Sequence, residues 1–194
     1  MIFVGSQLDG VEIFEPDVKG DSRGFFVEVF HVQHQRIAAL TDRDGSSIAG
    51  SSIVQINHSR SHKGTLRGLH FQEPHAQGKL VWVARGAVFD VVVDIREHSP
   101  TFAKWMGIEL SEDDHRQVWI PPGFAHGFCV TSDEADFLYA CTDLYSPECE
   151  HAIRWDDPAI GIRWPVDEPV VSDKDRSAPL LTDAAVLPAY DPSS

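Results

Sequence analysis

The stretch from residue 79 to residue 95 constrains the fold more than any other part of the chain. Residues 88–95 form a β-branched run in which side chains alternate between two faces, as they do in a strand. One face would carry Phe89, Val91, Val93 and Ile95, and the other face Val88, Asp90, Val92 and Asp94. Residues 79–84 predict a preceding strand, and Arg85-Gly86 supplies a turn between the two. This part of the chain is therefore predicted to form two consecutive strands.

Further strand signals lie at residues 118–120, 128–130 and 137–141, which are bounded by turns rich in Gly, Pro or polar residues. Helix signals are weak: residues 32–40 predict one short helix, and residues 111–114 indicate an exposed turn. Many short strands with Gly and Pro turns are typical of β-sandwiches and closed barrels. We therefore predict an all-β fold with a few short helices.

The length of the chain bounds the number of domains. It has 194 residues, of which 42% are hydrophobic, enough for one buried core and short for two. We expect a single domain over residues 1–194, with residues 177–194 as an exposed C-terminal tail. No apolar run is long enough to span a bilayer, and the first residues lack the basic and apolar regions of a secretory signal. A cytoplasmic location, away from the membrane, is the resulting expectation.

Cysteine spacing and net charge exclude several classes of protein. Cys129, Cys141 and Cys149 are odd in number and show no CxxC spacing, so neither a disulfide framework nor a thiolate zinc site is predicted. The formal net charge of −14 repels nucleic acid, whose non-specific binding depends on neutralised phosphates. A small anionic ligand is compatible with this charge if the scarce cations gather in one cleft.

Polar and titratable residues are densest between residues 55 and 72. Three of them share the parity of one strand face: Gln55, Asn57 and Ser59. The pattern alone favours the outer face for these three, because polar residues alternate outward in a half-buried strand. Arg67 and His70 have opposite parity, so a regular strand would point them to opposite faces. A bulge at Gly68 would re-aim one of the two side chains.

His126 follows a tight Pro-Pro-Gly turn, and the segments around His70 and His126 resemble the two halves of the cupin pattern. Metal-binding cupins carry His-x-His in the first half, where this chain has His70-Phe71-Gln72. A mononuclear site needs three or four convergent nitrogen or oxygen ligands, and these segments supply two. No spacing requires His58, His62 or His75 to complete the set, so we predict no metal site.

A series of short motifs follows the order found in one family of enzymes. They are residues 21–28 (DSRGFFVE), 55–57 (QIN) with Ser59, 66–72 (LRGLHFQ), 77–81 (QGKLV), 94–96 (DIR), 99–101 (SPT), 122–128 (PGFAHGF), 145–147 (YSP) with Glu150, 155–158 (WDDP) and 172–175 (SDKD). In these motifs the chain resembles the dTDP-4-dehydrorhamnose 3,5-epimerases. The resemblance implies a cupin-like β jelly roll of two packed antiparallel sheets.

The resemblance also implies a role for each residue that matches a family motif. His70 matches the catalytic base, Asp175 the carboxylate paired with it, and Tyr139 the proton donor. The matched substrate-binding positions are Arg23, Glu28, Gln55, Asn57, Arg67, Lys79, His126, Glu150 and Lys174. Two alternatives stay open. Tyr145 is a second candidate donor with the parity of Tyr139, and Asp90 is a second candidate partner for the base.

The substrate of the family, a dTDP-linked 4-keto-6-deoxyhexose, explains why these residue types are needed. Carbons 3 and 5 flank the ketone and carry acidified hydrogens, so inversion requires a base on one face and an acid on the other. A neutral histidine suits the base, since its unperturbed pKa is about 6.5, and a tyrosine can deliver a proton to the opposite face. Lys79 is the candidate cation for the enolate oxygen. The ketone of the substrate is the electron sink, so no cofactor is expected.

Family resemblance further implies a homodimer in which N-terminal strands cross to the neighbour and hide exposed sheet edges. The chain departs from short family members by extra residues around positions 42–52. The sequence leaves open whether carbon 3, carbon 5 or both are inverted. A metal-dependent cupin enzyme and a non-catalytic sugar-binding jelly roll are the alternative interpretations, and the joint presence of a base and a donor argues against the latter.

Overall fold

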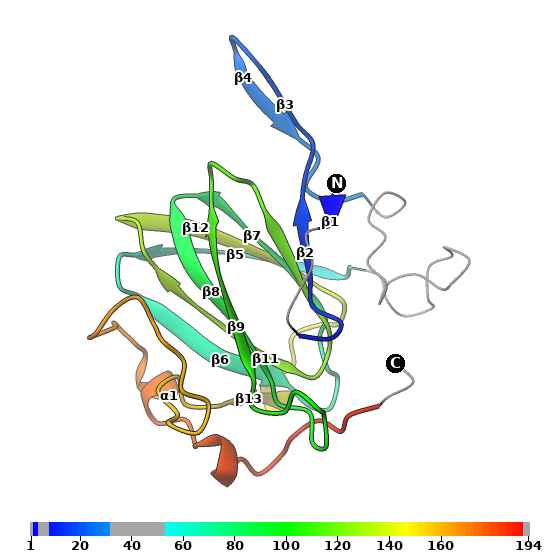
Figure 1. Cartoon of the computed structure of the whole chain (residues 1–194), viewed down its shortest axis with the longest axis vertical. Helices are drawn as coiled ribbons and strands as arrows, with labels where there is room; N and C mark the ends of the chain where they lie inside the picture. Colours follow the sequence, from blue (N-terminus) through cyan, green and yellow to red (C-terminus); the bar gives the residue numbers. More distant parts are fainter. Residues whose placement is uncertain (1, 4–7, 32–52, 192–194) are drawn as a thin grey trace.

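Two antiparallel sheets packed face to face form the body of the protein, which is a jelly roll (Figure 1). The computed structural model describes residues 2–3, 8–31 and 53–191, with the backbone alone for residues 2–3. The six-stranded sheet has the order β1 (Ile2–Phe3), β2 (Glu12–Glu15), β10 (Gln117–Ile120), β7 (Lys79–Arg85), β12 (Glu134–Cys141) and β5 (Gln55–His62). The five-stranded sheet has the order β13 (Glu150–Ala152), β6 (Leu66–Gln72), β11 (Phe124–Val130), β8 (Ala87–Asp94) and β9 (Trp105–Ser111).

The two strands predicted from residues 79–95 are β7 and β8, and they belong to different sheets. β7 pairs with β10 and β12, whereas β8 pairs with β11 and β9, all antiparallel. The turn at Arg85-Gly86 therefore carries the chain from one sheet to the other. The predicted all-β class and the two-sheet jelly roll are confirmed.

The main core lies between the sheets, and its side chains come from both of them. β7 contributes Val81 and Val83, and β8 contributes Val88 and Val92, all buried. The opposite face of β8, with Val91, packs into a second cluster. Both faces of β8 are thus covered, as in a fully buried strand, and the division of its residues between the faces is the predicted one.

The chain after β13 covers the outer face of the five-stranded sheet. Ile153, Ile160 and Leu181 are buried in the second cluster with residues of β6 and β8. This cover has little regular structure: its elements are α1 (Asp173–Arg176) and the 3₁₀ turn η3 (Leu181–Asp183), preceded along the chain by η2 (Pro147–Cys149). In Figure 1 α1 lies beside β6. The cover brings residues of the C-terminal part close to the strand that carries His70.

The segment that we expected to be an exposed tail packs against the body as far as residue 190. Thr182 and Asp183 are exposed as expected, but Pro188 is buried. The Glu97 N–H donates to the Pro188 carbonyl (2.8 Å), and the Tyr190 N–H donates to the Glu97 carbonyl (3.1 Å). These backbone bonds hold residues 188–190 against the body, although the polar, Pro-containing sequence predicted an exposed tail.

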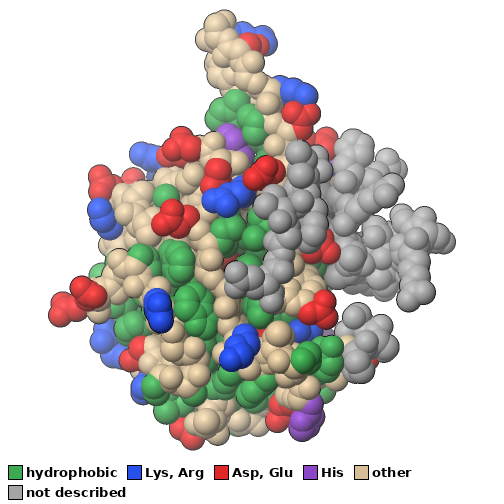
Figure 2. Space-filling model, viewed as in Figure 1, with side chains coloured by type: hydrophobic (Ala, Val, Ile, Leu, Met, Phe, Trp, Pro, Cys, Tyr) green, Lys and Arg blue, Asp and Glu red, His purple; other side chains and the backbone are tan. Residues whose placement is uncertain are grey.

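A two-stranded hairpin stands out from the body, as Figures 1 and 2 show. It consists of β3 (Val18–Asp21) and β4 (Gly24–Val27). Phe25 and Phe26 are 62% and 69% exposed, which is unusual for two adjacent aromatic side chains.

Some expectations need correction or remain outside the described residues. β9 was not predicted, although the alternation of Met106, Ile108 and Leu110 indicates a strand whose apolar face joins the core. The turn at residues 111–114 is confirmed. The predicted helix at residues 32–40 and the extra segment at 42–52 lie outside the described residues. Within the described ranges, no helix is long and apolar enough to cross a membrane.

The bulge proposed at Gly68 is present where β6 meets β11. His70 pairs with His126 and Arg67 pairs with Phe128, so β6 has one residue more than β11 between the two pairs. Gly68 has φ +128°, and a Cβ there would lie 2.6 Å from the Cα of Gly127. Only a glycine allows the two backbones to approach this closely.

We predict that Gly68→Ala destabilises the protein far more than Gly64→Ala. Both residues have positive φ, but no atom lies within 4 Å of a Cβ built at Gly64. Strained φ costs about 1–3 kcal/mol at either position, and the clash adds about 1–3 kcal/mol at Gly68. Urea unfolding measures both losses. Equal losses for the two variants would show that the contact with Gly127 is not the constraint.

Candidate active site

One cavity of about 660 Å³ collects most of the titratable residues singled out in the sequence. It opens between the two sheets, with walls from β5, β6, β7, β11 and β12 and from the segments around residues 145–150 and 170–175. The predicted residues that line it are Gln55, Asn57, Arg67, His70, Lys79, His126, Tyr139, Tyr145, Glu150, Lys174 and Asp175. Residues from distant parts of the chain are therefore brought to one place.

β5 turns its polar face inward. Gln55, Asn57 and Ser59 line the cavity, whereas Ile56 between them is 60% exposed. The expectation from alternation alone, which placed the polar face outward, is wrong. Alternation says which residues share a face, but a polar inner face can be told from a polar outer face only by what lies opposite.

β6 supplies both Arg67 and His70 to the cavity, because the bulge at Gly68 offsets their opposite parity. His70 Nε2 lies 2.6 Å from Asp175 Oδ1. Asp175 is almost fully buried and sits in α1, where the Ser172 hydroxyl accepts the Asp175 N–H at 3.1 Å. The predicted partner of the base is therefore in hydrogen-bond contact with it, across 105 residues of sequence.

Burial and hydrogen bonding act in opposite directions on Asp175. Burial raises the pKa of its carboxyl, but the hydrogen bond and the charge of His70, with further bonds from Ser172 and the Gly68 backbone, outweigh burial and lower it. The carboxylate form is thus favoured. An ionised partner holds the imidazole in one tautomer and stabilises its protonated form.

A second histidine–carboxylate pair lies on the neighbouring strands. His126 Nε2, on β11, is 2.7 Å from Asp90 Oδ2, on β8. Both side chains are buried, and the other oxygen of Asp90 has no hydrogen-bond partner among the described residues. The alternative that Asp90 supports His70 is therefore not what the structure shows, because the Asp90 carboxylate reaches diagonally across the β8–β11 ladder to His126.

Lys79 begins β7 and points into the cavity with 9% of its surface exposed. Burial lowers the pKa of its ammonium, and the charges of Cys141, Glu150 and Asp90 partly oppose that effect. Lys79 forms no ion pair with any residue in the described ranges. A buried cation of this kind is an electrostatic partner for negative charge that develops on a ligand.

The two candidate proton donors occupy different positions. Tyr139 lies in β12, and burial is the main cause that raises the pKa of its phenol. Tyr145 lies beyond the end of β12 and is 51% exposed. Its hydroxyl donates to Glu150 (2.7 Å), and this hydrogen bond raises the pKa of the Tyr145 phenol. The strand parity that seemed to make them equivalent does not apply, since β12 ends at Cys141.

Glu150 joins two further residues of the site. Lys174 Nζ lies 2.5 Å from Glu150 Oε2, the oxygen that also accepts the Tyr145 hydroxyl. Burial raises the pKa of Glu150, but the bonds from Lys174 and Tyr145 outweigh it, so the pKa is lowered. The three side chains form a charged rim, and we call Tyr145, Glu150 and Lys174 the rim cluster.

Arg23 and Glu28 are not brought to the cavity of their own chain. Arg23 occupies the turn of the projecting hairpin, where its side chain is 87% exposed and bonds to Asp21. Glu28 follows β4 at the base of the same hairpin. The hairpin points away from the body, so a single chain does not bring these two residues to its own cavity, and their role in substrate binding stays a prediction.

Sequence reasoning missed two glutamines that line the cavity, Gln72 and Gln77. Both belong to motifs that carried the family resemblance, and that membership was the available signal. His58, His62 and His75 do not line the cavity; each lies within ion-pair distance of a carboxylate elsewhere. Across the described part of the chain, no group of three or more His, Cys, Asp and Glu side chains could hold a metal ion.

The fold and the site define a jelly-roll protein with acid–base side chains in a polar cavity, and comparison with known proteins identifies its family. The sequence profile of the dTDP-4-dehydrorhamnose 3,5-epimerases matches residues 5–183. The chain therefore belongs to the dTDP-4-dehydrorhamnose 3,5-epimerase family, whose members are isomerases.

Individual relatives agree with this assignment. The dTDP-4-dehydrorhamnose 3,5-epimerase of Shigella flexneri is 51% identical over 185 residues, covering 95% of this chain and 98% of that protein. The crystal structure of the 3,5-epimerase of Legionella pneumophila, in complex with dTDP-4-keto-L-rhamnose, has 48% identity, a TM-score of 0.89 and 98% coverage of both chains. A 3-epimerase of Streptomyces niveus is 39% identical, over 94% of this chain and 86% of that one.

We predict that Asp175→Asn removes part of the acid sensitivity of folding. The native pKa of Asp175 lies below its unfolded value, so its stabilising contribution is complete above the unfolded pKa and is lost as the pH falls through the native pKa. The difference in free energy of unfolding between the wild type and the variant should shrink as the pH falls below about 4. Urea unfolding between neutral and acid pH measures it. A constant difference would contradict the pairing with His70.

Proposed function

We propose that this protein epimerises a dTDP-4-keto-6-deoxyhexose at carbon 3, at carbon 5 or at both, as in the biosynthesis of dTDP-L-rhamnose or a related deoxysugar. The observation that carries the proposal is the His70–Asp175 pair facing the same cavity as Tyr139 and Lys79. Binding alone needs no base paired with a carboxylate. The 3,5-epimerases and the 3-epimerase among its relatives support the reaction type.

His70 is proposed to remove the proton next to the ketone. Asp175, ionised and 2.6 Å away, would stabilise the imidazolium that forms. Tyr139 is proposed to deliver a proton to the opposite face of the carbon, which inverts the centre. Its phenol keeps its proton at neutral pH, because burial raises a pKa that is already high.

Lys79 is proposed to stabilise the enolate. The ammonium is buried in the cavity, where water screens charge poorly, and a charge that develops on the ketone oxygen would be the partner that Lys79 otherwise lacks among the described residues. The ketone of the substrate takes up the electron pair, so we propose that no cofactor and no metal takes part. Metal analysis of active protein tests this point.

Substrate binding is proposed to rest on the other residues of the cavity: Gln55, Asn57, Arg67, His126, Glu150 and Lys174. In a chain with a net charge of −14, Arg67, Lys79 and Lys174 gather in one cavity, as a diphosphate ligand requires. On the face seen in Figure 2, acidic side chains are spread over the surface. This charge makes binding of nucleic acid unfavourable. A cytoplasmic location remains a prediction from the sequence.

We further propose a homodimer in which Arg23 and Glu28 reach the cavity of the partner subunit. Both lie outside the cavity of their own chain, on or next to a hairpin that projects from the body. Phe25 and Phe26 on that hairpin expose apolar surface that association would bury. A hairpin that extends into a neighbour accounts for both observations.

Deuterium incorporation tests the reaction and separates the roles of its residues. In deuterated water, wild-type protein should place deuterium at carbon 3, at carbon 5 or at both in dTDP-4-keto-6-deoxyglucose. His70→Asn should lose exchange and epimerisation together, by about 10²–10⁴-fold. Tyr139→Phe should still form the enolate. If the proton taken up by His70 exchanges with solvent before it returns to the same face, deuterium should enter while little inverted product appears.

Tyr145→Phe is the matched control for the donor. Normal inversion by Tyr139→Phe together with loss by Tyr145→Phe would transfer the donor role to Tyr145. Continued exchange at both carbons in His70→Asn would place the base elsewhere. If the wild type incorporates no deuterium, the proposed reaction is wrong.

Subunit mixing tests the role of Arg23. His70→Asn lacks the base and Arg23→Ala lacks the arginine, so each homodimer should be impaired at low substrate concentration. A mixed dimer would combine the intact His70 of one chain with the intact Arg23 of the other in one cavity. Refolding the two variants together should therefore restore part of the activity. No restoration, or a monomer in sedimentation at micromolar concentration, would contradict the shared site.

A further inference from the structure

We propose that Gln72 is a positioning residue: its side-chain amide fixes the segment from residue 142 to residue 149, and so holds Tyr145 within reach of Glu150 in the cavity. The inference extends the proposed function, since Tyr145 and Glu150 line the cavity proposed to bind the sugar nucleotide. Gln72 has no assigned role in the mechanism above, although it ends the LRGLHFQ motif.

The segment needs an anchor because it has little core of its own. It follows β12, contains only the short turn η2, and none of the residues of η2 is buried. Leu144 and Tyr145 are mostly exposed. A stretch with few buried side chains is held by polar bonds or is locally unstable.

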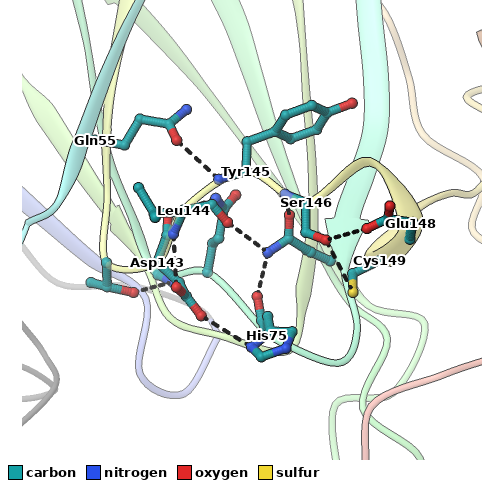
Figure 3. A network of polar contacts seen from close by, with 12 residues as sticks. Gln55, His75, Asp143, Leu144, Tyr145, Ser146, Glu148 and Cys149 are labelled. Carbon is teal, nitrogen blue, oxygen red and sulfur yellow. Dashed lines mark hydrogen bonds and ion pairs between the residues drawn. The ribbon is translucent and has the colours of Figure 1, made fainter.

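Gln72 provides the central bonds of this anchor. Its Nε2 donates to the carbonyl oxygens of His75 (2.5 Å) and Leu144 (3.1 Å), and its Oε1 accepts the N–H of Ser146 (2.9 Å). Two of these bonds hold the backbone of Leu144 and Ser146, the residues on either side of Tyr145. The bonds at His75, Leu144 and Ser146 can be followed in Figure 3.

The geometry separates positioning from substrate binding. Gln72 is 5% exposed, both of its N–H groups are used, and its oxygen already accepts one bond. Little hydrogen-bonding capacity is left for a ligand, although the residue borders the cavity. By contrast, Gln55 makes one bond to this segment, accepting the Tyr145 N–H at 2.9 Å.

The consequence for the site runs through the rim cluster. Because Gln72 holds the backbone on both sides of Tyr145, the Tyr145 hydroxyl lies 2.7 Å from Glu150. Glu150 in turn binds Lys174. Without the Gln72 amide, the carbonyls of His75 and Leu144 and the N–H of Ser146 would have to bond to water. The segment would then be less ordered. The segment would move while the two sheets remain folded.

The test replaces Gln72 by methionine, which has a similar length and no amide, and follows tyrosine titration by NMR with ring-labelled tyrosine. The chain has three tyrosines, so each resonance can be assigned, with Tyr145→Phe identifying Tyr145. In Gln72→Met the pKa of Tyr145 should fall toward its ordinary value, because its bond to Glu150 is lost. The raised pKa of Tyr139, which rests on burial, should stay.

Gln117→Met is the matched control. Gln117 is fully buried in β10, donates to the Val29 carbonyl (2.7 Å) and does not line the cavity. This variant should lose stability without a change in the titration of Tyr145. In turnover, Gln72→Met should lose about 10²-fold in kcat/KM, as expected when a side chain of the site is displaced by about 1 Å.

Gln72→Leu gives a second measurement if the methionine variant fails to fold. It removes both donors and the acceptor for Ser146 and adds no charge, so the same fall in the pKa of Tyr145 is expected. A wild-type titration of Tyr145 in either folded variant, or a change of equal size in Gln117→Met, would overturn the proposal. Because the titration needs no substrate, it gives its answer even if the proposed epimerisation is wrong.

Discussion

The site depends first on the contact between Gly68 and Gly127, where β6 and β11 approach too closely for any side chain. The extra residue of β6 at this point reverses the parity of one half of the strand. Arg67 and His70 then face the same cavity, and His70 lies in register with His126. A local backbone irregularity thus decides which side chains can act together.

The chain after β13 contributes both to the hydrophobic core and to the lining of the cavity. Its apolar residues, such as Ile160 and Leu181, cover the outer face of the five-stranded sheet and complete the core. Its polar residues Lys174 and Asp175 enter the cavity from the side. Because the same segment serves both, the position of the carboxylate next to His70 is as well defined as the packing of the core.

Much of this arrangement could be predicted, and the failures have physical causes. The alternation in β8 indicated its two faces, and the motifs indicated His70, Asp175 and Tyr139. Parity could not say that Gln55 faces inward, because that depends on what lies opposite. It could not separate Tyr145 from Tyr139, because parity holds only within one strand and β12 ends at Cys141, before Tyr145. Nor could it pair Asp90 with His126, since cross-strand register is set by tertiary structure.

The separation of 105 residues between His70 and Asp175 has a consequence for the order of events during synthesis. A chain grows from its N-terminus, and contacts between distant residues form late. All strands of the two sheets precede Asp175 in the sequence. The growing polypeptide can therefore pair the strands of both sheets before Asp175 reaches His70, so that the hydrogen bond between these two side chains forms only after the sheets are in place.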